Sequence, residues 1–165
     1  MWGCPTFNAV RAAVRKQGLP ALLFALLLAA CDGHTRFHSF QPMADEGWSR
    51  TDTLTFSLPP ADAEGDYQLL VGMRYGKDFP YEGIWMTVET ELPPSPSVRR
   101  DTVYFRMNMP EEARSRGIMY AQQEMPVAVV HLKQAQPCRI RLRHIMRREV
   151  MPDISDIGLR LTSLP

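Results

Sequence analysis

Thr53-Leu54-Thr55-Phe56-Ser57-Leu58 is the stretch that decides the fold class. Apolar and hydroxyl-bearing residues alternate in it without a break, and a period of two is the pattern of a β-strand with one buried face. The same period recurs along the chain, in the runs 67–73, 84–88, 103–109, 127–132, 139–146 and 157–161. Seven runs of this kind predict seven or eight short strands.

Residues that end strands lie between these runs. They occupy positions 59–60, 61–66, 93–96 and 136–137 and are rich in proline or polar side chains. One segment is typical of a short helix, with Asn108 as its cap and Gly117 at its exit. We therefore expect an all-β fold, an antiparallel β-sandwich or jelly roll of seven to eight strands with one short helix.

The N-terminal segment is typical of a bacterial secretory signal. Three basic residues precede an apolar run, 19–30, that is too short to span a bilayer. The run ends in Leu28-Ala29-Ala30-Cys31, the pattern of a lipoprotein signal. We expect cleavage between Ala30 and Cys31 and lipid on the Cys31 thiol. Each buried methylene contributes about 0.8 kcal/mol, so two or three acyl chains would anchor the protein almost irreversibly.

Removal of residues 1–30 leaves 135 residues, enough for one domain with a core. We expect residues 31–50 to form a tether with a first edge contact and residues 51–165 to form the β-sandwich. The mature part, residues 31–165, has 16 basic and 18 acidic residues. Its formal charge of −2 gives no reason to expect a nucleic acid partner. Cys138 would be its one free thiol. It falls on the apolar side of its strand, which favours a buried core position over a nucleophile or zinc ligand.

No catalytic or metal-binding motif stands out in the sequence. The patterns of a nucleophile elbow, a zinc protease and a phosphate loop do not occur. His34 and His38 are four residues apart, but they lie in the expected tether without a helical pattern. His131 and His144 fall within strand patterns, where a histidine in or beside the core is expected. We predict no catalytic residue, metal site or cofactor, and hence a protein that is not an enzyme.

A row of arginines is more distinctive. Arg139, Arg141, Arg143 and Arg147 alternate with apolar residues, and alternate residues on a strand face lie about 6.6 Å apart. Such a row could bind an acidic glycan, lipid head groups or a carboxylate-rich partner. It could equally be a solvated outer face paired with acids of a neighbouring strand, such as Glu89. The sequence favours the second interpretation.

Aromatic residues form the second candidate surface. Trp85 is on the polar side of its strand, and Tyr81 lies in the turn before it. Exposed aromatic rings bind sugars or protein partners. Alternatively, Phe79-Pro80-Tyr81 folds back to cover one end of the sandwich, which is a structural role. Both interpretations stay open at this point.

Several short motifs occur in a fixed order over nearly all of the chain after residue 30. They are Cys31-Asp32, Trp48, 52–56, 67–74, 78–85, 101–103, 144–147 and 154–161. In this order they resemble the GldH family of gliding motility lipoproteins of Bacteroidetes. The two C-terminal motifs carry most of the resemblance.

The resemblance implies an envelope lipoprotein connected with surface gliding and without known catalytic activity. We therefore expect a protein anchored by palmitate and related acyl chains at Cys31, at the outer membrane, with its periplasmic or external facing left open. Its role would be that of an accessory or scaffold for envelope protein partners. The alternative is a surface lipoprotein that binds glycans through Trp85, Tyr81 and the arginine row.

Overall fold

The computed structural model describes residues 34–94, 98–108 and 119–165, and the regular structure in these ranges is β-strand. The strands are β1 (Thr35–Pro42), β2 (Trp48–Ser49), β3 (Leu54–Leu58), β4 (Gly65–Gly76), β5 (Gly83–Glu91), β6 (Val98–Arg106), β7 (Tyr120–Leu132), β8 (Cys138–His144), β9 (Val150–Met151) and β10 (Ile154–Ser163).

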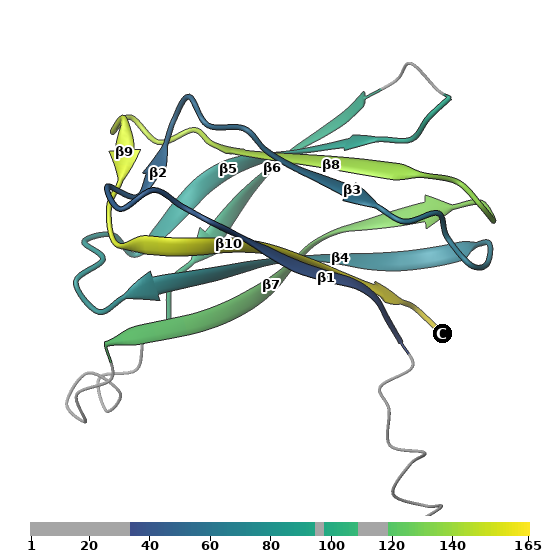
Figure 1. Ribbon diagram of the computed structural model, residues 1–165, viewed down its shortest axis with the longest axis horizontal. Coiled ribbons are helices and arrows are strands. Elements are labelled where there is room, and N and C mark those ends of the chain that lie inside the picture. Colours follow the sequence, from purple (N-terminus) through teal and green to yellow (C-terminus); the bar gives the residue numbers. More distant parts are fainter. Residues whose placement is uncertain (1–33, 95–97, 109–118) are drawn as a thin grey trace, which may run out of the picture. The chain divides into compact units, whose positions relative to one another are not determined.

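Eight longer strands form two antiparallel sheets, in the orders β1-β10-β4-β7 and β3-β8-β5-β6. Figure 1 shows these sheets as two layers. The two-residue strands β2 and β9 pair with each other at one end of the layers. Apart from the consecutive pair β5-β6, neighbouring strands of the two sheets are distant in the sequence. An eight-stranded double sheet with this order is typical of a jelly roll.

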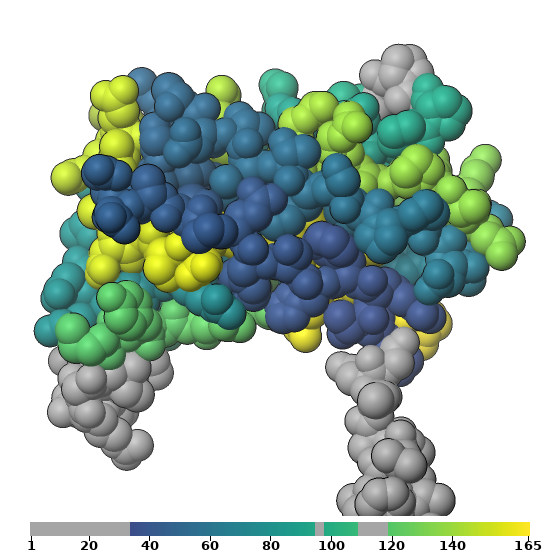
Figure 2. Space-filling view, in the orientation of Figure 1, coloured from purple at the N-terminus to yellow at the C-terminus, as the bar shows by residue number. Residues whose placement is uncertain are grey.

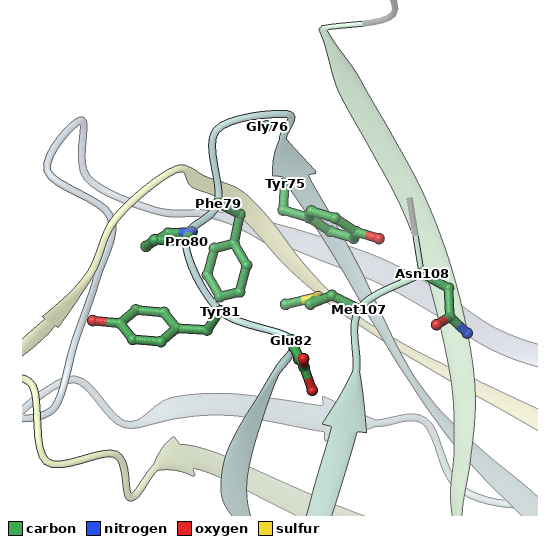
Figure 3. A pocket seen from close by; sticks show the side chains of 8 residues that line it. All are labelled: Tyr75, Gly76, Phe79, Pro80, Tyr81, Glu82, Met107 and Asn108. Carbon is green, nitrogen blue, oxygen red and sulfur yellow. The ribbon is translucent and has the colours of Figure 1, made fainter. Parts of the chain in front are cut away.

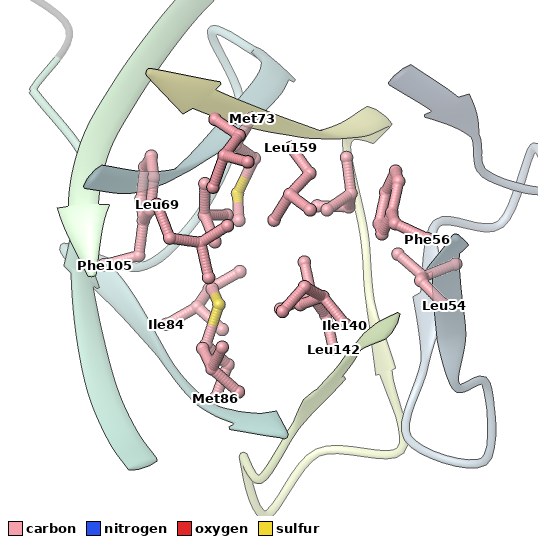
Figure 4. Packing of buried hydrophobic residues seen from close by; sticks show 14 of the residues in the cluster. Leu54, Phe56, Leu69, Met73, Ile84, Met86, Phe105, Ile140, Leu142 and Leu159 are labelled. Atoms are coloured by element: carbon pink, nitrogen blue, oxygen red, sulfur yellow. The ribbon is translucent and has the colours of Figure 1, made fainter. Parts of the chain in front are cut away.

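The core lies between the two layers because the period of two sends alternate side chains inward. In β3, Leu54, Phe56 and Leu58 are buried while Thr55 and Ser57 are exposed. Figure 4 shows Leu69 and Leu159 of one sheet and Ile140 of the other in the same buried cluster. Most of the inward residues predicted from the alternation are therefore confirmed as core. Val103, Met107 and Met146 are only partly buried, and Met109 lies outside the described residues.

The number of strands and the helix need correction. The structure has ten strands, because β2 and β9 are too short to show any alternation in the sequence. The expected helix falls almost entirely on residues 109–118, which lie outside the described residues, and the described residues hold no helix. Hence no helix long and apolar enough to cross a membrane is present among them.

The expected tether, 31–50, also differs from the structure. Residues 35–42 form β1, which pairs with β10 along most of its length, and the Trp48 side chain is fully buried. In Figure 2 this part of the chain, in purple and blue, spreads over the visible side of the domain. The expected edge contact is present, since β1 is the edge strand of its sheet. The full strand was not predicted because β1 has only intermediate and exposed side chains, so its sequence lacks a clear alternation.

Two glycines allow an aromatic ring to lie flat on the outer face of the first sheet. Gly158 of β10 pairs with Phe40 of β1 and with Gly72 of β4. A Cβ at either glycine would lie 2.6 Å or 2.8 Å from the Phe40 ring. The Arg74 guanidinium carbon covers that ring at 4.2 Å from its centroid, so the ring is held between the backbone and a cation.

Candidate interaction surface

The outward side chains of the β3-β8-β5-β6 sheet form a surface that we call the arginine face. It consists of Trp85, Thr87, Glu89 and Glu91 of β5, Arg100, Thr102 and Tyr104 of β6, and Arg139, Arg141 and Arg143 of β8. Register places them in rows across the three strands: Glu89 lies between Arg100 and Arg141, and Thr87 lies between Thr102 and Arg143. The strand alternation that buries Ile140 and Leu142 therefore projects the arginines outward.

Ion pairs neutralise one part of the arginine face. Arg139 and Arg141 both donate to Glu91, at 3.2 Å and 2.8 Å. Glu89 accepts from Arg100, with the Nη2 and Oε1 atoms 2.6 Å apart, and lies 3.9 Å from Arg141. For Arg139 and Arg141, the interpretation as a row paired with acids of the neighbouring strand is thus confirmed.

Arg143 continues the same row but has different surroundings. Its cross-strand neighbour is Thr87, whose hydroxyl donates to the Arg143 carbonyl at 3.3 Å. The Arg143 guanidinium forms no ion pair with any described residue. Arg147 is not in the row, because β8 ends at His144.

An apolar patch adjoins the charged rows. Trp85 is 48% exposed and pairs across the strands with Tyr104, with ring centroids 5.0 Å apart and the planes tilted by 45°. Gly83 leaves room for the Tyr104 ring, since a Cβ there would lie 2.6 Å from it. Ile145, 42% exposed, donates its backbone amide to the Trp85 carbonyl at 2.9 Å. We call Trp85, Tyr104 and Ile145 the Trp85 patch.

Trp85 lies on the outward side of the sheet, in contact with Tyr104. It lines none of five cavities found among the described residues, whereas Ile145 of the same patch lines one of them.

Tyr81 lies away from this surface, in the turn before β5. Figure 3 shows it with Phe79, Tyr75 and Met107 around a cavity of about 390 Å³. Phe79 is buried, and its ring contacts those of Tyr75 and Tyr81 at centroid distances of 6.0 Å and 5.7 Å. The Tyr81 hydroxyl accepts from Arg148 at 3.4 Å. The structural interpretation of Phe79-Pro80-Tyr81 is therefore the one that the contacts support.

A second depression, of about 380 Å³, lies beyond the end of β8. It is lined by Arg50, Thr51, Arg143, His144, Ile145, Met146 and Arg147, and we call it the arginine depression. Sequence reasoning missed Arg50 because it assigned that residue to the tether. It missed Tyr104 and Ile145 as surface residues, although both lie on the outward side of the alternation.

His144 is buried beneath the arginine depression. Its Nε2 is 3.1 Å from the Trp48 carbonyl, and its ring packs edge-on against Trp48 at 5.1 Å. Burial lowers the pKa of His144, and the positive charges of Arg50 and Arg143 lower it further, while backbone hydrogen bonds to Trp48 and Glu149 oppose this. The histidine is therefore neutral at pH 7 and donates from Nε2 to the carbonyl.

The remaining candidate residues have structural partners. His131 is exposed and bonds to Asp66 at 2.8 Å, which with Glu64 raises its pKa. Cys138 is buried, and burial raises the pKa of its thiol to about 11. A thiol with that pKa is a poor nucleophile at neutral pH.

Comparison with known proteins identifies one sequence family. Residues 35–161 match the family described as GldH lipoprotein. The chain is also similar to the gliding motility lipoprotein GldH of Flavobacterium johnsoniae, with 25% identity over 159 residues, which covers 90% of this chain and 96% of that protein.

Solved structures show only distant similarity. A GH115 4-O-methyl-α-glucuronidase with specificity for decorated arabinogalactans matches 82% of this chain and 18% of its own, with 12% identity and a TM-score of 0.42. A family 35 carbohydrate-binding module from Clostridium thermocellum matches 78% of this chain and 93% of its own, with 17% identity and a TM-score of 0.41. Similarity at this level carries no argument about function.

Proposed function

Since the chain belongs to the GldH lipoprotein family, we propose that it is a non-catalytic accessory or scaffold protein of an envelope complex, held at the outer membrane by lipid on Cys31. It acts by binding a protein partner through the Trp85 patch. The observation that carries this proposal is the exposed Trp85, in ring contact with the half-buried Tyr104 on the outer face of the sheet.

The anchor part of the proposal rests on Leu28-Ala29-Ala30-Cys31 and the apolar run before it. Only three residues lie between Cys31 and Thr35, where β1 begins, and the four steps from one to the other span at most about 14 Å in an extended chain. Lipid on Cys31 would therefore keep the first strand close to the bilayer surface.

The binding part rests on the composition of the Trp85 patch. Large aromatic side chains dominate the energetics of protein interfaces, and a surrounding of satisfied polar groups is the usual rim of such a site. The paired rows of Glu89, Glu91, Arg139 and Arg141 provide that rim on one side.

Crosslinking in cells tests the partner. A photo-crosslinking amino acid at Thr87, beside Trp85 on β5, should capture a defined envelope protein. Trp85→Ala should reduce that capture about tenfold or more, the loss typical of an aromatic interface anchor. Tyr120→Ala is the matched control, since Tyr120 is an exposed aromatic residue on β7 of the other sheet. Unchanged capture with Trp85→Ala, or no captured protein, would contradict the proposal.

Metabolic labelling tests the anchor. Radiolabelled palmitate should label the wild-type protein, and Cys31→Ala should abolish labelling and leave the leader uncleaved. Equal labelling of both proteins would show that Cys31 does not carry the lipid.

Glycan binding is the competing outcome for the same surface. Calorimetric titration of the purified lipoprotein with acidic and neutral oligosaccharides should show no saturable heat. Saturable binding that Trp85→Ala removes would replace the protein partner by a sugar.

A further inference from the structure

Arginines without an acidic partner gather at one end of the domain. Of the described arginines, seven form ion pairs with acidic side chains. The other five are Arg50, Arg106, Arg143, Arg147 and Arg148. Three of these five line the arginine depression. No described acidic oxygen comes within 4.0 Å of those three guanidinium groups.

Three separate parts of the chain bring these charges together. Arg50 follows β2, Arg143 is the second-last residue of β8, and Arg147 lies in the connection from β8 to β9. Pairing of β2 with β9 fixes that connection next to the end of β8, because Ser49 pairs with Val150 and the Arg50 amide donates to the Glu149 carbonyl at 2.7 Å. Arg143 and Arg147 are close in the sequence, and the fold brings the distant Arg50 to them.

The depression combines its positive charges with an apolar lining. Ile145 and Met146 supply apolar walls around the three cationic groups.

We propose that the arginine depression binds an acidic segment of the protein partner, in which carboxylates meet Arg50, Arg143 and Arg147 and an apolar side chain covers Ile145. This rests on the proposed function and specifies its partner. Guanidinium groups hold carboxylates by paired, charge-assisted hydrogen bonds. Ile145 belongs both to the depression and to the Trp85 patch, so one partner segment would cover both.

The lining of the depression favours a protein segment over a lipid surface. Three arginines and the exposed Ile145 lie together in it. An acidic protein segment can present carboxylates and an apolar side chain side by side, which matches both kinds of lining.

Direct binding to a defined probe tests the ligand class. The full lipoprotein in nonionic detergent is titrated with a dye-labelled peptide of alternating glutamate and leucine, and with its lysine–leucine counterpart. The acidic peptide should bind, and more weakly as salt rises. The double variant Arg143→Gln/Arg147→Gln should weaken binding about tenfold or more, as expected for lost charge-assisted hydrogen bonds.

The matched control removes two charges elsewhere. Arg36→Gln/Lys133→Gln alters exposed cations outside the depression and should leave peptide affinity within about twofold. Equal affinity for the two peptides, or an equal loss in both double variants, would overturn the inference. So would binding of phosphatidylglycerol vesicles, but not of the acidic peptide, in an Arg143- and Arg147-dependent manner.

The crosslinking experiment separates this inference from the proposed function. Capture that depends on Trp85 and also falls with Arg143→Gln/Arg147→Gln supports both. Capture that depends on Trp85 but is insensitive to the double variant and to salt overturns only the acidic-segment inference. Peptide binding without any Trp85-dependent partner overturns only the proposed role of the patch.

Discussion

Arg141 and Arg143 are two residues apart on one strand face, yet they have opposite surroundings. Arg141 contacts two carboxylates, whereas Arg143 faces a threonine and the arginine depression. An exposed ion pair stabilises a protein by at most about 1 kcal/mol. The functional difference at the residue scale is therefore one of availability: Arg143 is free to bind an outside anion, and Arg141 is not.

His144 should make the protein less stable in acid. Its pKa is lowered in the folded state, so only the unfolded chain takes up a proton as the pH falls below about 6.5. Its contribution is complete above that pH and is lost on further acidification. Thermal unfolding at pH 7.5 and 5.5 measures the loss.

His144→Gln should show a shallower acid loss, together with a lower melting temperature at pH 7.5 because contact with Trp48 is reduced. The control is His131→Gln. The pKa of His131 is raised, so its contribution is present at low pH and lost as the pH rises through the folded value. An ordinary or raised pKa for the His144 ring in an NMR titration would contradict the prediction.

Cys138 should be unreactive in the folded protein. With a pKa of about 11, about one thiol in a thousand is ionised at pH 8, and the side chain is also buried. Maleimide should label the membrane-extracted protein only after addition of denaturant. Ser57→Cys, on the outward side of β3, should label at once. Labelling of the native wild type would show that Cys138 is accessible or that Cys31 is free.

At the scale of elements, β1 depends on close packing across the first sheet. Phe40 lies over Gly158 and Gly72 and under Arg74, so its ring supplies an apolar contact on a face that is otherwise polar. Cation–π contact and ring burial together explain why an edge strand without alternation still docks in register.

Gly158→Ala should therefore destabilise the protein by about 1–3 kcal/mol, the usual cost of an added methyl in a tight contact. Its Cβ would lie 2.6 Å from the Phe40 ring. Denaturant unfolding measures the change. Phe40→Leu should recover part of the loss in the double variant, because the two residues touch.

Gly65→Ala is the control for that substitution, since no heavy atom lies within 4 Å of its Cβ position. Its effect should stay within about 0.5 kcal/mol. Equal losses at Gly65 and Gly158 would show that the contact with the Phe40 ring is not the cause.

At the scale of the whole molecule, one cluster of buried side chains joins the two sheets. Leu159 and Val71 come from one layer, and Ile140 and Val88 from the other, and all four are fully buried. A shared core of this kind makes the sheets unfold together, so the arginine face has no stable form apart from the β1 sheet.

Leu159→Ala should lower the free energy of unfolding by about 2–5 kcal/mol, as large-to-small changes in a core do. Near- and far-ultraviolet circular dichroism should report the same shifted transition. Val129→Ala is the control, because that side chain on β7 is 43% exposed. Separate transitions for the two signals would contradict a common core.

The sequence was sufficient for properties that depend on a local period or a short motif. Alternation in 54–58 and 139–143 identified strands, their buried faces and the outward arginines, because side-chain direction on a strand follows from position alone. The same outward phase placed Trp85 on the surface. The order of the short motifs along the chain identified the GldH family, and the family match over residues 35–161 confirmed it.

Only the tertiary structure decided which residues meet. Partners far apart in the chain set the properties of Arg141 and Arg143, and the pairing of β2 with β9 brought Arg50 to Arg147. β1 was missed because its stability comes from Phe40 resting on Gly158, a contact across 118 positions of sequence. Sequence fixes the direction of each side chain locally, but long-range strand pairing determines its neighbours, and neighbours determine whether a charge is neutralised or available.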